Sequence, residues 1–281
     1  ISGTRPVDAA WPVFVGHAGV EFRAAKPISL LVGVDRSFRA PNIDDLTSRQ
    51  QAGPGFQFEN PNLVPEKALT VDAGLRLNMG RLSGELWGYY AGVDDAIVRS
   101  LRAIADCPDE TPQCKSSWSR YQLVNAPGSS FVTGFEVSAR LRFPDGFDTR
   151  AQVSYAYGSS PNPQPAPSDP SLPYETRVPL SRIPPLNGSV ETRYSHNRGF
   201  FVGAGLRWAT LQNRLAPTDL SDARIPKGGT PGFVVVDLRA GYRIARQLIV
   251  TTVVENVADA AYRYHGSSIN GPGRGFIINF E

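Results

Sequence analysis

The sequence contains few residues of the kinds that bind metals or carry thiol chemistry. It has two cysteines, three histidines and one methionine. His17, His196 and His265 are far apart and have none of the spacings of metal ligands, so we expect no metal site and no cofactor. Cys107 and Cys114 enclose the polar stretch PDETPQ, and so close a pair predicts a disulfide-closed loop in an oxidising compartment. Two unpaired thiols are the alternative.

The sequence also lacks a large excess of one sign of charge, long apolar runs and catalytic motifs. The 29 basic residues nearly balance the 26 acidic ones, which argues against a nucleic-acid-binding surface. No apolar run reaches the roughly 18 residues of a membrane-spanning helix. There is no Gly-x-Ser-x-Gly elbow, and the glycine-rich Gly271-Pro272-Gly273 precedes a predicted strand, so neither a hydrolase nor a phosphate-binding loop is indicated. We expect that the protein is not an enzyme.

What the sequence does contain is an alternation of apolar and polar residues with a period of two. In 131–143, Phe131, Phe135 and Val137 alternate with polar residues such as Glu136 and Arg140. The same alternation occurs in 69–79, 147–157, 186–194, 200–208 and 234–242. Because successive side chains of a strand point to opposite faces, each segment predicts a strand with one apolar and one polar face. The many glycines and prolines and the 10% of aromatic residues agree with an all-β chain.

Eleven strands are predicted along the chain. They cover 14–24, 28–39, 66–79, 81–98, 120–143, 147–158, 185–196, 199–212, 232–243, 247–257 and 273–280. Many have ten residues or more, whereas strands of soluble proteins usually have about 5–6. A strand of about 9–11 residues can cross a bilayer at a tilt, so these lengths fit a membrane barrel.

The connections between these strands alternate between short and long. Short turns are predicted at 25–27, around Gly80, and at 144–146, 197–198 and 244–246. Long polar loops are predicted at 40–65, 99–119, 159–184, 213–231 and 258–272, and we interpret the proline-rich 159–184 as a loop rather than an interdomain linker. All the long loops therefore fall at one end of the sheet, which is typical of an outer-membrane barrel with short periplasmic turns.

Aromatic residues on the apolar faces gather beside the short turns. They are Phe22, Phe143, Phe147, Tyr194, Phe200 and Tyr242. Such clustering predicts an aromatic girdle at a membrane interface, although aromatic residues are also common in strands of any kind.

The polar faces carry many charged residues, each of which would cost roughly 2–4 kcal/mol against lipid at the midplane. We therefore predict that they face the lumen of the barrel, where they contact water, one another or a plug. The set is Asp72, Arg76, Glu136, Arg140, Arg142, Asp148, Arg150, Glu191, Arg193, Asp237 and Arg239. For each residue, a solvated position with no ligand role is the alternative.

Several motifs, in order along the chain, resemble those of TonB-dependent outer-membrane receptors. Ser37-Phe38-Arg39-Ala40-Pro41-Asn42 resembles the end of a mid-barrel strand, and Asn60-Pro61-Asn62-Leu63-Val64-Pro65-Glu66 resembles the segment that begins the next. Pro179-Leu180-Ser181-Arg182-Ile183-Pro184 resembles the lead into a later strand. Glu255-Asn256-Val257-Ala258-Asp259 and Tyr262-Arg263-Tyr264-His265-Gly266-Ser267 resemble the family's "E-N-x-x-D…Y-R-x-H-G-S" external loop.

The resemblance implies that 1–281 is the C-terminal part of a transmembrane, antiparallel, up-and-down β-barrel of about 22 strands. No secretory signal begins at Ile1, from which we expect a piece of a longer protein. The implied location is the outer membrane of a Gram-negative bacterium. The implied partners are outer-membrane lipid, the protein's own plug domain, the TonB complex acting through a TonB box, and a ferric siderophore or similar scarce nutrient that is imported.

The predicted ligand-binding residues lie in the loops and the upper lumen. They are Arg120, Tyr121, Tyr262, Arg263, His265 and Arg274. Arginine suits carboxylate or phosphate groups and aromatic rings suit ring-rich ligands, while structural packing of the loops is the alternative for each residue.

Two other functions from different classes fit the same pattern. One is a passive porin or adhesion barrel whose loops bind a partner, and the other is a soluble all-β binding module. A plug domain encoded upstream would favour the receptor over the porin. Release from cells by salt without detergent would favour the soluble module.

Overall fold

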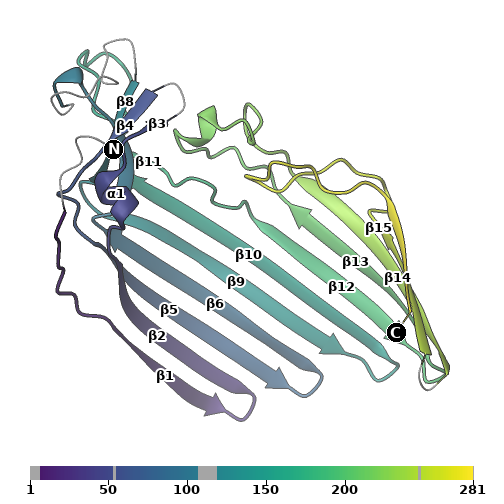
Figure 1. The fold of residues 1–281 in the computed structure, drawn as a ribbon. Coiled ribbons are helices and arrows are strands. Elements are labelled where there is room, and N and C mark those ends of the chain that lie inside the picture. The colour runs from purple at the N-terminus through teal and green to yellow at the C-terminus, as the bar shows by residue number, and fades with distance from the viewer. Residues whose placement is uncertain (1–6, 53–54, 107–118, 246–247, 281) are drawn as a thin grey trace.

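The computed structural model describes residues 7–52, 55–106, 119–245 and 248–280. Within them, eleven strands follow one another in a single antiparallel sheet (Figure 1). In sheet order they are β1 (Gly16–Ala25), β2 (Ile28–Arg39), β5 (Glu66–Met79), β6 (Leu82–Asp94), β9 (Ser130–Arg142), β10 (Phe147–Pro161), β12 (Asn187–Ser195), β13 (Phe200–Ala209), β14 (Phe233–Ala245), β15 (Leu248–Glu255) and β16 (Gly275–Phe280). A further short strand, β11 (Arg177–Pro179), pairs with the end of β10. The all-β, up-and-down prediction is confirmed.

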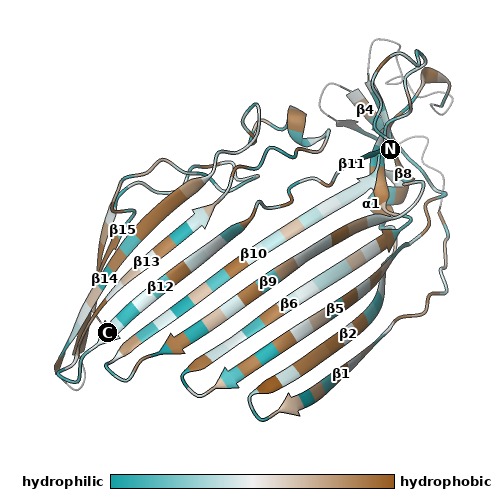
Figure 2. Cartoon of the chain, turned by 180° about the vertical axis from the view of Figure 1, so that it is seen from behind, coloured by the Kyte–Doolittle hydropathy of each residue, from teal (hydrophilic) through white to brown (hydrophobic). Residues whose placement is uncertain are grey.

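The register of the sheet separates its two faces. Residues directly opposite each other in paired strands lie on the same face. Val137 stands opposite Leu86 and Val153, whereas its neighbour Ser138 stands opposite Glu85. Apolar and polar residues thus alternate along the strands (Figure 2), and we name the two sides the apolar face and the polar face.

The apolar face is exposed, which is the reverse of a soluble protein. Val137 is 37% exposed and Val32 is 52% exposed, and exposed large apolar residues occur on nearly every strand of the sheet. Monomeric soluble proteins rarely leave apolar patches larger than a few hundred Å² uncovered. The few buried apolar residues lie mainly in and beneath the loops.

The long connections all lie at one end of the sheet and the short turns at the other, as predicted (Figure 1). We call these the loop end and the turn end. None of the helices in the described part of the chain is long and apolar enough to cross a membrane.

Two of the predicted strands were wrong in extent. The range 81–98 covers β6 and the first residues of the separate β7 (Ile97–Leu101), and the range 120–143 covers most of β8 (Ser119–Asn125) and all of β9. A positive φ at Asp95 (59°) and at Gly128 (102°) breaks each segment. The alternation stops at both breaks, at Asp94-Asp95 and at Pro127-Gly128, so turn residues in the sequence already marked where the chain leaves the sheet.

The loops predicted at 40–65 and 99–119 contain structure of their own. β3 (Gln50–Ala52), β4 (Gly55–Phe58), β8 and β7 form a second sheet in that order, with β4 and β8 parallel. Two short 3-10 helices also lie in loops, η1 (Ile104–Asp106) and η2 (Asp219–Ser221). The predicted disulfide between Cys107 and Cys114 lies outside the described residues.

A one-turn helix, α1 (Ile43–Thr47), fixes the start of the loop after β2. Its N-cap Asn42 accepts a hydrogen bond from the Asp45 backbone, and the Asp45 carboxylate accepts one from the Asn42 backbone, which completes a capping box. Arg39 at the end of β2 pairs with Asp45 at 2.8 Å and with Glu66 of β5 at 2.6 Å. The first loop is therefore joined to both strands that it connects.

Candidate functional site

The loop that follows β15 folds back over the polar face of the sheet. Tyr262, which is 6% exposed, packs on Phe233 with ring centroids 5.0 Å apart, and Val235 beside them is fully buried. Phe233 and Val235 belong to β14 and lie on the same face as Asp237, two residues further along the strand. The apolar anchor of the loop is therefore a small hydrophobic cluster on the otherwise polar face.

Asn256 holds the two ends of this loop together. It is fully buried, and its amide donates to the carbonyls of Ala260 (2.9 Å) and Pro272 (3.0 Å) while accepting from the Ala260 amide (2.8 Å). Its backbone N–H donates to Asp237 Oδ1 at 2.9 Å. The φ of Asn256 is 48°, a conformation that asparagine tolerates better than most residues. The Asn256 side chain therefore connects the two ends of the loop 258–272, and the Asn256 backbone connects the loop to β14.

Beneath this loop lies a cavity of about 420 Å³, which we call the loop-end pocket. The loop contributes Arg263, Tyr264 and His265, and the polar face contributes Glu191, Arg207, Asp237 and Arg239. The volume is within the range of about 300–1,000 Å³ typical of small-molecule sites. Residues of β12, β13 and β14 and of the inward-folded loop, together with residues of other loops such as Thr230, thus line one hollow.

Two ion pairs line the wall of the loop-end pocket. Arg207 binds both oxygens of Asp237, at 3.2 and 3.3 Å, and donates to the Tyr264 hydroxyl at 3.2 Å. Arg239 donates to Glu191 at 2.8 Å. Since Asp237 also accepts from Asn256, it couples the pocket wall to the base of the loop.

Arg263 differs from these two arginines because it has only neutral partners among the described residues. Its Nε donates to Asn270 Oδ1 at 2.8 Å and its Nη1 to the Arg224 carbonyl at 3.3 Å. Its positive charge is therefore positioned but not neutralised by a carboxylate, and it can still attract an anionic ligand.

His265 lies half-buried at the edge of the same pocket. Its Nδ1 is 2.9 Å from Thr230 Oγ1, and its Nε2 is buried with no hydrogen-bond partner among the described residues. Burial lowers the pKa of His265 below its ordinary value of 6.5, while the carboxylates of Asp219 and Asp222 act weakly in the opposite direction. The neutral imidazole is therefore the form that the folded loop favours.

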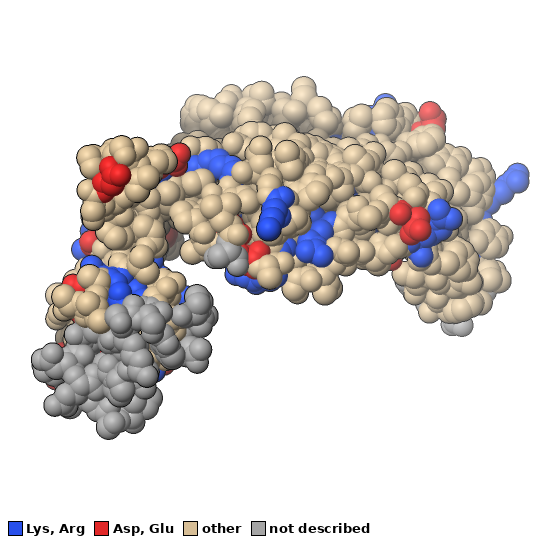
Figure 3. All heavy atoms as spheres, turned by 90° about the horizontal axis from the view of Figure 1, so that it is seen from above, with Lys and Arg blue, Asp and Glu red and all other residues tan. Residues whose placement is uncertain are grey.

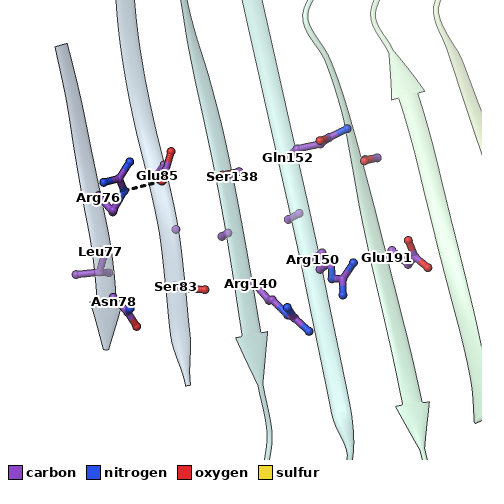
Figure 4. A pocket seen from close by; sticks show the side chains of 14 residues that line it. Arg76, Leu77, Asn78, Ser83, Glu85, Ser138, Arg140, Arg150, Gln152 and Glu191 are labelled. Atoms are coloured by element: carbon purple, nitrogen blue, oxygen red, sulfur yellow. Dashed lines mark hydrogen bonds and ion pairs between the residues drawn. The ribbon is translucent and has the colours of Figure 1, made fainter. Parts of the chain in front are cut away.

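A second hollow, of about 610 Å³, lies on the polar face toward the turn end (Figure 4). We call it the turn-end hollow. Arg76 and Glu85, from neighbouring strands, form an ion pair of 2.7 Å within it, and Arg140 and Arg150 line it from the next two strands.

Arginine is in excess over carboxylate at this end. Asp148 is shared by Arg140 at 2.7 Å, Arg150 at 3.2 Å and Arg142 at 3.7 Å. One carboxylate cannot neutralise three guanidinium groups, so this part of the polar face has a local positive charge.

The register places every residue of the predicted lumen-facing set on the polar face. Arg76 stands opposite Glu85, and Arg150 stands opposite both Arg140 and Glu191. The paired residues of the following strands, up to β14, lie on the same face. The remaining members are Asp72, Glu136, Arg142, Asp148, Arg193, Asp237 and Arg239. They share one face of the sheet in this register, whereas their exposure to a lumen and a role for each in contact with a plug or ligand stay predictions.

The structure brings together only part of the predicted ligand-binding set. Arg263 and His265 line the loop-end pocket, and Tyr262 lies beneath it in the hydrophobic cluster. Arg120 and Tyr121 lie in β8 of the second sheet, and Arg274 precedes β16 with its backbone N–H bound to Asp259. These last three line neither hollow.

Three residues of the loop-end pocket were missed at the sequence level. Arg207 occupies a polar position of a predicted strand, and Tyr264 lies inside the quoted loop motif, so both carried a usable signal. Thr230 lies in a different loop and carried none. Among the described residues, no group of three or more His, Cys, Asp and Glu side chains is arranged to hold a metal ion.

Comparison with known proteins gives one family and a consistent fold. The family described as "TonB dependent receptor-like, beta-barrel" matches residues 3–257. A search of curated proteins gives no match.

Solved structures of this fold are similar over nearly the whole chain. The copper transporter OprC is 23% identical with a TM-score of 0.70, and the match covers 93% of this chain and 38% of that one. The ferric enterobactin receptor PfeA of Pseudomonas aeruginosa is 16% identical with a TM-score of 0.68, covering 92% and 39%. The FrpB iron transporter of Neisseria meningitidis is 18% identical with a TM-score of 0.65, covering 93% and 38%. The chain thus spans well under half the length of these proteins, and the likeness concerns the fold.

Replacing Asn256 with alanine should loosen the loop 258–272. The substitution removes three buried hydrogen bonds and leaves buried backbone groups unpaired, so we expect the local opening free energy of the loop to fall by about 3 kcal/mol. Hydrogen exchange of the loop amides in the full-length protein measures this quantity. The exposed Asn213→Ala in a neighbouring loop is the control and should leave it unchanged. Equal protection in both variants would contradict the proposed role of Asn256.

Protonation of His265 should destabilise the same loop. Because its pKa is lowered in the folded state, the unfolded loop binds the proton more tightly. Stability is therefore complete above pH 6.5 and is lost as the pH falls from 6.5 through the lowered folded-state pKa. Amide protection of 258–272, corrected for intrinsic exchange, should fall over this window in the wild type and in His196→Gln, but not in His265→Gln. A flat wild-type profile would rule this out.

Proposed function

The chain belongs to the TonB-dependent receptor β-barrel family, and from this premise we propose that it forms part of the wall of an outer-membrane transporter that imports a scarce metal as an anionic chelate. The observation that carries the proposal is the loop-end pocket, where an inward-folded loop holds Arg263, Tyr264 and His265 over the polar face.

The exposed apolar face supports the membrane placement. In a barrel that spans a membrane, the apolar residues contact lipid and the polar ones face the interior. In the alternative, a soluble binding module, the whole apolar face would contact water. The free-energy cost would be roughly 25 cal/mol for each Å² of exposed apolar surface. The sheet pattern therefore favours lipid on one side and an aqueous or plugged lumen on the other.

The chemistry of the loop-end pocket favours a ligand that is anionic and carries rings. Arg263 offers a positive charge without a carboxylate partner, and Tyr264 offers an aromatic surface on the same loop. The similar solved proteins include transporters named for iron, copper and ferric enterobactin. A ferric catecholate combines negative charge with aromatic rings, and it fits these residues better than a neutral sugar does.

The turn-end hollow supports a contact with a plug domain. The arginines around Asp148 leave a local positive charge beside the turn-end hollow, which has a volume of about 610 Å³. A partner that fills this part of the lumen should present carboxylates there, since charge complementarity sets the register of such interfaces. We infer that the plug surface facing β9 and β10 is acidic, and that TonB acts on the plug rather than on this wall.

Replacing Arg263 with glutamine should weaken binding of a ferric catecholate. A charge-assisted hydrogen bond to an anionic ligand is lost, so we expect the Kd to rise by about tenfold or more. Binding to the full-length receptor can be measured by fluorescence quenching or calorimetry. A neutral ferric hydroxamate should show little change, and Arg198→Gln at the turn end is the charge-matched control. An unchanged Kd for the catecholate would overturn the assignment of this pocket.

A lysine on the apolar face should be far more costly than one on the polar face of the same strand. Val137→Lys places a charge against lipid and should reduce the folding free energy by about 2–4 kcal/mol, whereas Ser138→Lys should cost about 1 kcal/mol or less. Denaturant titration of the full-length protein in lipid vesicles gives both values. Equal costs would mean that the apolar face does not contact lipid.

A further inference from the structure

The apolar face ends, at the loop end of the sheet, in a ladder of aromatic rings. Tyr90, Phe131 and Tyr157 come from three adjacent strands, with ring centroids 5.8 and 6.2 Å apart. All three lie on the apolar face. Tyr90 and Tyr157 stand opposite Thr133 of β9, and Phe131 and Val137 lie on the same face as Thr133 because they are an even number of residues away from it in the strand. Tyr90 is 48% exposed, so the ladder is open to the surroundings.

Two arginines lie directly on this ladder. The guanidinium carbon of Arg177 is 5.3 Å from the ring centroid of Phe131, and that of Arg214 is 3.8 Å from the centroid of Tyr157. Both distances are within the range of about 6 Å for a cation–π contact. The two charges come from β11 and from the loop after β13, and they lie on neighbouring rings.

Both guanidinium groups are held by neutral oxygens alone. Arg177 donates to Ser159 Oγ at 3.2 Å and to the carbonyls of Ser129 and Ser159 at 3.1 and 3.2 Å. Arg214 donates to the Gly158 carbonyl at 2.5 Å. Neither has a carboxylate partner among the described residues, unlike the arginines of the polar face, and Asp94, which binds Ser129 Oγ, forms no ion pair with Arg177.

The height of this cluster on the sheet matches the boundary of a membrane. From Phe131 to Phe143, at the opposite turn, β9 advances twelve residues, or about 40 Å at roughly 3.3 Å per residue. At a tilt of about 45° this spans about 28 Å, close to the roughly 30 Å of the hydrocarbon core. The two guanidinium groups lie on Phe131 and Tyr157, at the loop-side end of this span, where the hydrocarbon core meets the lipid headgroups.

A third cation extends the same row. Arg36, Leu69, Gly92 and Phe131 stand opposite one another across four strands. Arg36 is exposed and, within the described part of the chain, has no acidic partner. Seen from the loop end, basic side chains lie at several places along the edge of the molecule, and acidic ones lie beside only some of them (Figure 3).

From this arrangement we propose that Arg177 and Arg214, with the ring ladder beneath them, form a docking site for a phosphate-bearing glycolipid of the outer leaflet. The acyl chains lie along Tyr90, Phe131 and the apolar residues below, and the phosphate groups bind the two guanidinium groups. The inference rests on the membrane placement proposed above. Charge complementarity supports it, because the two positive charges lack carboxylate partners and are fixed in place before a ligand arrives.

The test uses the full-length receptor, purified in detergent and freed of lipid, and native mass spectrometry. The probe is a diphosphorylated lipid A, compared with the same lipid after removal of its phosphates. Wild-type protein should bind the phosphorylated form at least about tenfold more tightly, and the double variant Arg177→Gln/Arg214→Gln should lose that preference. Lys227→Gln/Arg198→Gln removes the same charge elsewhere and should retain it.

Three outcomes would overturn the inference. The double variant could keep the wild-type preference, the phosphate-free lipid could bind as tightly as the phosphorylated one, or inorganic phosphate at millimolar concentration could displace the lipid completely. The last result would identify a site for soluble anions. The double variant should still bind the ferric catecholate, which shows that it is folded. If Val137→Lys is costly while the double variant keeps its lipid preference, the membrane placement stands and only the lipid site fails.

Discussion

The hydrogen-bonded ladder between antiparallel strands is the interaction on which the rest of this structure depends. In a bilayer no water is available to the backbone, so each amide and carbonyl within the hydrocarbon must find a partner inside the protein. Adjacent strands of the meander supply these partners in an unbroken register from β2 to β14. The register in turn decides which side chains share a face, because a slip of one residue would exchange the apolar and polar faces.

The two faces use arginine in different ways. On the polar face arginines pair with carboxylates across strands, as Arg76 does with Glu85 and Arg239 with Glu191. On the apolar face, charge is tolerated only at the loop end, where Arg177 and Arg214 stack on rings instead of pairing with acids. The proposed placement accounts for the difference: a wall that faces protein or water can contain both signs of charge, whereas a rim beside anionic headgroups would gain from positive charge.

At the loop-end pocket, the loop 258–272 packs against the polar face of the sheet. Apolar packing of Tyr262 on Phe233 draws the loop inward, and Asn256 closes it. Asp237 then links the base of the loop to Arg207, so the charges of the pocket and the position of the loop depend on the same carboxylate. A ligand that contacts Arg263 and Tyr264 is thereby connected to β13 and β14 through a few short contacts.

The sequence by itself determined the strands, their two faces and the end of the sheet at which the long loops lie. Period-two alternation and turn residues are local properties, and they placed all eleven strands of the meander and the whole set from Asp72 to Arg239 on one face. Only the tertiary structure decided that β4 and β8 pair in parallel in a second sheet. It alone decided that Arg263 and His265 share a pocket while Arg120 and Arg274 do not. The physical reason is that alternation records which way a side chain points, whereas the meeting of two loops depends on packing between residues far apart in the chain.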